Sequence, residues 1–146
     1  MLSLRIAIDF DGTIVEHRYP EIGKEKLFAF ETMRALQKEG HRLILWTVRT
    51  GKALDQAVEY CRKHGVEFYA VNKSYPEEEI TPDSQRKIEA DIYIDDRNIG
   101  GLPGWGEIWH LLHPEERPTP EMEKRNVSQQ KSIFSRLFKI NKKLLK

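Results

Sequence analysis

The stretch LRIAIDFDGTIV, residues 4–15, places two aspartates directly after a run of apolar residues. The run at residues 4–8 is bounded by polar residues and is too short for a core helix, so it predicts a buried strand. Asp9 and Asp11 then follow the carboxyl end of that strand, and Gly12 suits the sharp turn that comes next. The stretch therefore predicts a strand whose end carries carboxylates.

Three more short apolar runs predict further buried strands. They lie at residues 43–46 in HRLILWT, 68–71 in EFYAVN and 92–94 in DIYID. The segments that separate the first three strands have the apolar spacing of helices and end at a glycine. The apolar positions are Leu27, Phe30, Met33 and Leu36 before Gly40, and Leu54, Ala57, Val58 and Cys61 before Gly65.

Strands that alternate with helices indicate an α/β fold, here a Rossmann-like open parallel sheet flanked by helices. A further helix is expected at residues 104–112, where it would bury Trp105, Ile108 and either Trp109 or Leu112 against the sheet. We expect one compact domain over residues 1–114. Prolines and polar residues then predict a linker at 115–130, and residues 131–146 form a basic, amphipathic tail.

The net charge of +1 conceals an uneven distribution. Residues 124–146 contain eight Lys or Arg residues and no acid, whereas residues 1–123 hold the other sixteen bases and all twenty-three acids. A basic amphipathic segment is typical of binding to nucleic acid, to an anionic membrane surface or to a partner groove, and it is equally compatible with disorder in isolation.

Polar side chains follow three of the four predicted strands. Besides the first strand, Thr47 and Arg49 follow the second, and Asp95 and Asp96 follow the fourth. In an open parallel sheet, ligands bind outside the carboxyl ends of the strands, so these side chains are expected to converge. Several acids in one cleft repel each other, and a hard cation that prefers oxygen ligands, such as Mg²⁺, compensates them most simply.

The motifs DFDGT, LILWT, a lysine and IYIDD, in this order, resemble those of the haloacid dehalogenase superfamily of phosphotransferases over nearly all of residues 4–113. The resemblance implies that Asp9 is the nucleophile that becomes an aspartyl-phosphate. It implies that Asp11 is the general acid and then the base, and that its backbone carbonyl touches the metal. Asp95, with Asp96 as helper or alternate, is implied as the remaining metal anchor.

The resemblance also implies contacts to the phosphate. Thr47 matches a hydroxyl that binds a phosphoryl oxygen, while Gly12 and Arg49 are expected beside the substrate. Lys87 is our preferred charge-neutralising lysine, with Lys73 as the alternative. The acid at position 11 favours hydrolysis of a phosphate monoester, and the expected enzyme is a Mg²⁺-dependent phosphatase.

The segments where this superfamily inserts a cap are short here, so no cap domain is expected. About ten residues after Thr13 suffice for a small hairpin flap. An uncovered site suits a bulky substrate or a homo-oligomer in which a neighbour forms the lid. The substrate would be a small phosphate ester, such as a sugar phosphate or nucleotide.

Two alternatives stay open. Thr47-x-Arg49 and IDDR at residues 94–97 are similar to the phosphatase part of bacteriophage polynucleotide kinase, which favours the 3′-phosphate of a nucleic acid end as substrate. A non-catalytic domain that presents the basic tail is the other hypothesis. A lone Cys61 and the absence of any run near the ~20 apolar residues that cross a bilayer lead us to expect a soluble, cytoplasmic protein.

Overall fold

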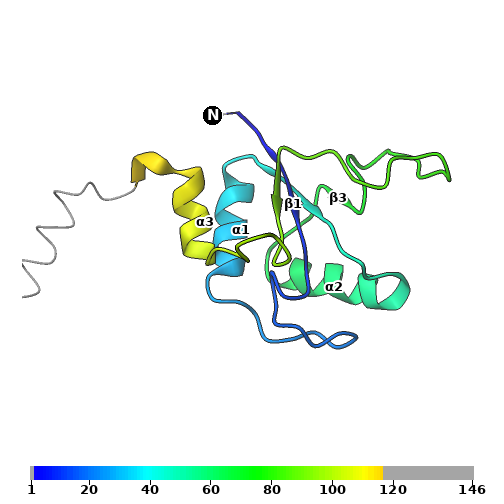
Figure 1. Cartoon of the computed structure of the whole chain (residues 1–146), viewed down its shortest axis with the longest axis horizontal. Coiled ribbons are helices and arrows are strands. Elements are labelled where there is room, and N and C mark those ends of the chain that lie inside the picture. Colours follow the sequence, from blue (N-terminus) through cyan, green and yellow to red (C-terminus); the bar gives the residue numbers. More distant parts are fainter. Residues whose placement is uncertain (1, 117–146) are drawn as a thin grey trace, which may run out of the picture. The chain divides into compact units, whose positions relative to one another are not determined.

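The computed structural model describes residues 2–116. Four parallel strands form one sheet in the order β3-β2-β1-β4, which places β1 and β2 at its centre (Figure 1). The strands are β1 (Arg5–Ile8), β2 (Arg42–Leu45), β3 (Ala70–Val71) and β4 (Ile92–Ile94). The α/β fold with a parallel sheet, predicted from the alternation of apolar runs and helical segments, is confirmed.

The strand cores are apolar on both faces, as expected of a parallel sheet that is covered on both sides. Ile6 pairs with Leu43 and Ile92, and Ile8 pairs with Leu45 and Ile94. Because side chains alternate along a strand, these residues face one side of the sheet and Ala7 faces the other. The observed bounds of β4 match the predicted run, whereas β3 covers only two of its four predicted residues.

Two helices cover the first of these faces. Helix α1 (Ala29–Lys38) joins β1 to β2, and α2 (Gly51–Lys63) joins β2 to β3. The connections from β1 to β2 and from β2 to β3 run in the same direction along the sheet. Because such parallel connections are right-handed, both helices lie on the same face. The rings of Phe30 and Tyr60 meet there, with centroids 5.8 Å apart.

The opposite face is covered by the connection between β3 and β4, which contains no helix. Ile88 of this connection packs on Ala7 and Ile44 from the two central strands. Trp46, Tyr69 and Tyr93 are partly buried around this cluster. An ordered but irregular connection thus replaces a helix on this side of the sheet.

The prediction for Leu27 is wrong. It was expected on the buried face of the first helix, but α1 begins at Ala29 and the Leu27 side chain is 76% exposed. Phe28 adopts a left-handed backbone conformation, with φ 63°, which interrupts the helical period just before the helix starts. The other predicted apolar positions of this helix are buried: Phe30, Met33 and Leu36.

Helix α3 (Trp105–Leu112) lies where a helix was predicted, and Trp105 and Ile108 are buried. The chain divides into two compact units after Trp109, and a short 3-10 turn, η1 (Pro114–Glu116), belongs to the second. From residue 117 on, the predicted linker and basic tail lie outside the described residues.

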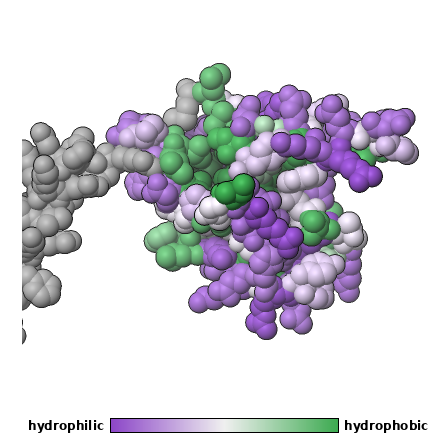
Figure 2. Space-filling model, in the orientation of Figure 1, coloured by the Kyte–Doolittle hydropathy of each residue, from purple (hydrophilic) through white to green (hydrophobic). Residues whose placement is uncertain are grey.

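None of the helices within residues 2–116 has the length and apolar character needed to cross a membrane. The visible face carries hydrophobic patches among hydrophilic side chains (Figure 2). Exposed apolar residues of the described part include Val48, which is 87% exposed in the loop after β2.

Candidate functional site

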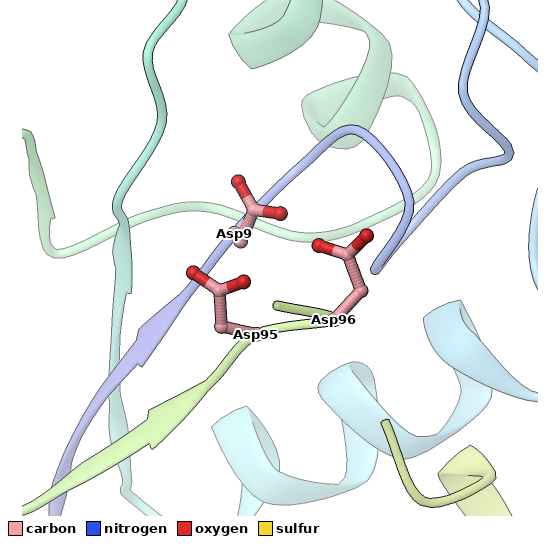
Figure 3. Close-up of side chains that lie close together, drawn as sticks. All are labelled: Asp9, Asp95 and Asp96. Carbon is pink, nitrogen blue, oxygen red and sulfur yellow. The ribbon is translucent and has the colours of Figure 1, made fainter. Parts of the chain in front are cut away.

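Three carboxylates converge at the carboxyl ends of β1 and β4. Asp9 follows β1, and Asp95 and Asp96 follow β4 (Figure 3). One oxygen from each side chain lies within 4.8 Å of the others. We call these three residues the carboxylate triad. Of the four acids predicted to surround a metal, the structure brings these three side chains together.

The sheet itself places the triad. Ile8 is paired with Ile94, and the backbone N–H of Asp9 donates to the carbonyl of Ile94 at 3.0 Å. Two parallel strands in this register end at the same level, so the residues that follow them must meet. Segments that are distant in the sequence thereby contribute to one site.

Thr13 fixes two members of the triad. Its hydroxyl lies 3.1 Å from Asp9 Oδ2 and 3.4 Å from Asp96 Oδ1, and it accepts a hydrogen bond from the Asp96 N–H at 3.1 Å. Thr13 is fully buried, and its own carbonyl accepts from Trp105 Nε1 at 2.9 Å. The turn after β1 is therefore held from both sides, which limits how far the carboxylates can move.

Gly12 is needed where it stands because its backbone passes close to two side chains. Its φ is +85°, and a Cβ atom there would lie 2.3 Å from both Asp96 Oδ2 and His17 Nε2. His17 Nε2 in turn lies 2.9 Å from Asp96 Oδ2. His17 was not predicted as a site residue, because nothing in its sequence context marks a histidine nine residues after the first strand as close to the end of the fourth.

The close approach of the three carboxylates shifts the pKa values of Asp9 and Asp96 in opposite directions. Burial, a hydrogen bond with Asp96 and the charge of Asp95 together raise the pKa of Asp9 to about 7. For Asp96, burial opposes the charged form, but hydrogen bonds with His17 and Asp9 outweigh it and lower the pKa. Of Asp9 and Asp96, Asp9 is therefore the one that takes up a proton more readily.

The triad has the composition of a cation site. All donors are carboxylate oxygens, which hard divalent cations prefer, and the raised pKa of Asp9 is the result expected where carboxylates gather without a neighbouring cation. A metal ion held by these three residues would relieve the repulsion between the carboxylates. The residues present therefore fit a divalent metal ion.

Asp11 lies apart from the triad and is paired with an arginine. Arg49 donates through Nε to Asp11 Oδ2 and through Nη2 to Asp11 Oδ1, both at 2.7 Å. The Arg49 side chain is fully buried and that of Asp11 is 8% exposed. Two parallel N–H···O bonds between a guanidinium and a carboxylate are the strongest ion-pair geometry available in proteins.

Arg49 was predicted to contact the substrate, and in the structure its side chain is surrounded by protein acceptors. Its remaining N–H groups donate to the carbonyls of Pro20, Glu21 and Ala53. Five donors are all that a guanidinium has. Because each is directed at a protein acceptor, none is left for a phosphate. Arg49 thus forms a buried ion pair in this structure, and a contact with substrate stays a prediction.

Thr47 is half-buried at the end of β2, and its neighbours fix its backbone. The N–H of Thr47 donates to Asn72 Oδ1 at 2.8 Å, and the Thr47 hydroxyl accepts from the N–H of Arg49 at 3.1 Å. Asn72 follows β3 with φ 52°. Sequence reasoning missed Asn72, although an Asn directly after a strand is a residue type that tolerates this conformation.

Lys87 lies on the exposed connection that precedes β4. Its Nζ is 4.8 Å from the ring centroid of Tyr93, the residue of β4 that pairs with Ala7. Lys87 therefore lies on the same face of the sheet as Tyr93 and Ala7. Lys73, the alternative, is half-buried in the loop after β3.

The segment after the first turn forms the predicted small flap. Val15 makes an antiparallel bridge with Glu25, and the N–H of Glu16 donates to the carbonyl of Lys24 at 2.8 Å. Tyr19 of this flap places its ring 5.2 Å from the Arg49 guanidinium. The flap is therefore tied to the loop after β2 through Arg49.

Comparison with known proteins found a related structure. It is described as the conserved protein coded by a locus from Bacteroides thetaiotaomicron, is 56% identical in sequence, and matches 80% of this chain and 94% of its own with a TM-score of 0.73. The chain and this Bacteroides protein therefore belong to the same family. Searches against family models and against curated proteins gave no match. The family relationship supports the α/β architecture, and the function has to be argued from the side chains.

Proposed function

We propose that this member of the family is a Mg²⁺-dependent phosphatase that hydrolyses a phosphate monoester through an aspartyl-phosphate on Asp9. The proposed fold is haloacid dehalogenase-like, without a cap domain. The observation that carries the proposal is the carboxylate triad, which unites the DFDGT and IYIDD motifs at the end of the sheet where ligands of open α/β sheets bind.

Asp9 is the proposed nucleophile. It is the first residue after β1, and the Thr13 hydroxyl orients its carboxylate. A carboxylate attacks a phosphate dianion slowly unless the negative charges are neutralised. Bound by the triad, Mg²⁺ would supply this neutralisation and hold the phosphate oxygens.

The proposed reaction has two steps on the protein. Asp9 takes the phosphoryl group from the ester, and water then releases inorganic phosphate and restores the Asp9 carboxylate. Thr47 is proposed to donate its hydroxyl to a phosphoryl oxygen, and Lys87 to balance the charge of the phosphate. The start of α2 at Gly51 follows Thr47 closely and adds backbone N–H groups that favour anions.

Release of phosphate from 4-nitrophenyl phosphate tests the proposal. Wild type should turn over only with Mg²⁺, and Asp9→Asn should lose nearly all of its kcat, because the attacking carboxylate is gone. Asp83→Asn is a matched control, since Asp83 is an exposed acid of the β3–β4 connection. Equal, magnesium-independent rates for wild type and Asp9→Asn would refute the enzymatic assignment.

The alternatives predicted from sequence gain no specific support within residues 2–116. The nucleic acid end hypothesis used Arg49 as part of its signature, and Arg49 is committed to Asp11. The hypotheses of a nucleic acid, a membrane surface or a partner bound by the tail concern residues 131–146, which lie outside the described residues. A small phosphate ester therefore remains our proposed substrate, with a homo-oligomer as a possible way to cover the open site.

A further inference from the structure

The connection between β3 and β4 forms a small hollow at the edge of the sheet where the carboxylate triad lies. Its volume is about 270 Å³, and Asn72, the first residue after β3, is part of its wall. The rest of the wall comes from residues 78–88 of the connection. We call this hollow the connection pocket. The following inference rests on the proposed function and names the substrate class of the same site.

The sheet places the connection pocket within reach of a substrate whose phosphate lies at the triad. The N–H of Trp46 donates to the carbonyl of Ile8 at 2.9 Å. The N–H of Asn72 donates to the carbonyl of Leu45 at 2.7 Å, so β1, β2 and β3 end at the same level. Neighbouring strands lie about 4.8 Å apart, which puts Asn72 roughly 10 Å along the edge from Asp9. An ester of the size of a sugar phosphate spans that distance.

Thr47 stands between the triad and the connection pocket. Its N–H donates to Asn72 Oδ1 at 2.8 Å, and its hydroxyl is the proposed contact to a phosphoryl oxygen. The Asn72 Nδ2 group carries two further donors, and it has no acceptor within residues 2–116. Asn72 therefore connects the proposed phosphate contact to the wall of the pocket and has donors left for a ligand.

Much of the pocket wall can form hydrogen bonds. Side chains with hydroxyl, amide and guanidinium groups line it: Thr81, Ser84, Gln85 and Arg86. The two hydroxyls lie 3.2 Å apart and hydrogen-bond each other. Gln85 and Arg86 are exposed, and within residues 2–116 their side chains make no hydrogen bond or ion pair. These two side chains are therefore free to bind a ligand.

The charges of the wall favour an uncharged ligand. Arg86 brings one positive charge and Glu78 one negative charge, and Glu78 Oε2 accepts from the N–H of Ser74 at 2.6 Å. A ligand with a carboxylate would meet both signs. Hydroxyl groups both donate and accept, so they suit a wall of mixed donors and acceptors. The apolar part of the wall can cover the C–H groups of the same ligand: Ile80, Pro82 and Ile88.

A larger hollow, about 880 Å³, lies between the flap and α2, but it leads away from the triad. Its wall includes Lys52 at the start of α2 and Lys63 at its end. At a rise of 1.5 Å per residue, these two positions are about 16 Å apart along the helix. Because α2 runs from the end of β2 back to the start of β3, most of this hollow lies beside the helix. The connection pocket is therefore better placed to hold a substrate.

We propose that the connection pocket binds the leaving group of the substrate, and that this group is a small, uncharged carbon chain rich in hydroxyls, as in the phosphates of sugars and sugar alcohols. The chain lies along the carboxyl edge of the sheet from Thr47 toward β3. Asn72, Gln85 and Arg86 hydrogen-bond its hydroxyls and thereby determine specificity. Alkyl phosphates lack these hydroxyls and nucleotides carry an aromatic base, so both are poorer substrates.

Full-length protein with Mg²⁺ provides the test. We would compare kcat/KM for sorbitol 6-phosphate and hexyl phosphate, which have equal numbers of carbon atoms and differ in their hydroxyls, and for adenosine 5′-monophosphate. Sorbitol 6-phosphate should exceed hexyl phosphate by about tenfold or more, because each hydrogen bond from the pocket contributes roughly a 2- to 10-fold difference. The ratio of the two values does not depend on the fraction of protein that is folded.

Gln85→Leu should lower this ratio by about 2- to 10-fold, since it removes one hydrogen-bonding group from the pocket. Arg86→Met should lower it as well. Gln56→Leu is a matched control, because Gln56 is an exposed glutamine of α2 that lines the larger hollow. It should keep the wild-type ratio, and a loss in Gln56→Leu alone would place the leaving group in the larger hollow and contradict the inference.

Other outcomes separate this inference from the proposed function. Hydrolysis of 4-nitrophenyl phosphate that is lost in Asp9→Asn would keep the phosphatase. If sorbitol 6-phosphate were then no better than hexyl phosphate or adenosine 5′-monophosphate, the inference would be overturned. A ratio that stays unchanged in both Gln85→Leu and Arg86→Met would overturn it too. No turnover of any compound, 4-nitrophenyl phosphate included, would refute both proposals.

Discussion

Arg49 donates a hydrogen bond to each carboxylate oxygen of Asp11, and both N···O distances are 2.7 Å. Neither side chain has appreciable contact with solvent, and they come from the loops after the two central strands. This buried pair links the turn that follows the candidate nucleophile to the start of α2. It therefore holds these two loops together.

Removing one partner of this pair should destabilise the protein strongly. Arg49→Met leaves the Asp11 carboxylate buried without a counter-charge, which typically costs about 3–5 kcal/mol. Urea unfolding followed by tryptophan fluorescence measures the free energy of unfolding. In Arg49→Met/Asp11→Leu no charge is left unpaired, so the double variant should be more stable than Arg49→Met. Additive losses in the double variant would show that the pair is not coupled.

Mg²⁺ should stabilise the folded chain through the triad. A ligand that binds only the native state at a hundred times its Kd adds about 2.7 kcal/mol. The Tm of wild type should therefore rise with Mg²⁺, and the rise should shrink in Asp95→Asn, which loses one carboxylate ligand. Asp83→Asn should respond as wild type does. An unchanged response in Asp95→Asn would remove that residue from the metal site.

The raised pKa of Asp9 predicts how stability varies with pH in EDTA. Its pKa is about 7 in the folded chain and 3.8 as the ordinary value, so between these values the folded state holds a proton that the unfolded state releases. The contribution of Asp9 is therefore fully present below about pH 4 and is lost as pH rises through 7. The free energy of unfolding of wild type, minus that of Asp9→Asn, should decrease over this range. A constant difference would contradict the raised pKa.

Gly12→Ala should lower the affinity for Mg²⁺, an effect separate from the stability that any alanine loses at a positive φ. A Cβ at this position would displace Asp96 and His17, two flexible side-chain ends only 2.3 Å away. Gly40→Ala is a matched control, since Gly40 also has a positive φ, +91°, but has nothing within 4 Å of its would-be Cβ. Both variants should lose a similar ~1–2 kcal/mol from backbone strain, while only Gly12→Ala should lose affinity for Mg²⁺ in calorimetry. Equal affinities would mean that the close approach is unimportant.

The sequence was sufficient for the sheet and for the triad because both follow from short-range rules. Apolar runs bounded by polar residues located β1, β2 and β4, and acids directly after parallel strands must meet when the strands are neighbours. The convergence of Asp9 with Asp95 also required β1 and β4 to be neighbours, which the structure shows.

The remaining features of the site depend on how loops fold back. Arg49 was expected beside the substrate, and its bonds to the carbonyls of Pro20 and Ala53 depend on how the flap and the start of α2 fold around it. His17 reaches Asp96 for the same reason. Leu27 was assigned to a helix because of its apolar spacing. That spacing carries no information on the left-handed conformation of Phe28, which leaves Leu27 exposed before the helix begins.

The central claim is that the triad makes Asp9 an acceptor of phosphorus. Protein quenched in acid during turnover of 4-nitrophenyl phosphate with Mg²⁺, then digested and examined by mass spectrometry, tests it most directly. We predict one phosphoryl group on the peptide that contains Asp9, and none in Asp9→Asn. Sustained turnover with no phosphorylated aspartate, or with the phosphoryl group on another residue, would contradict the account.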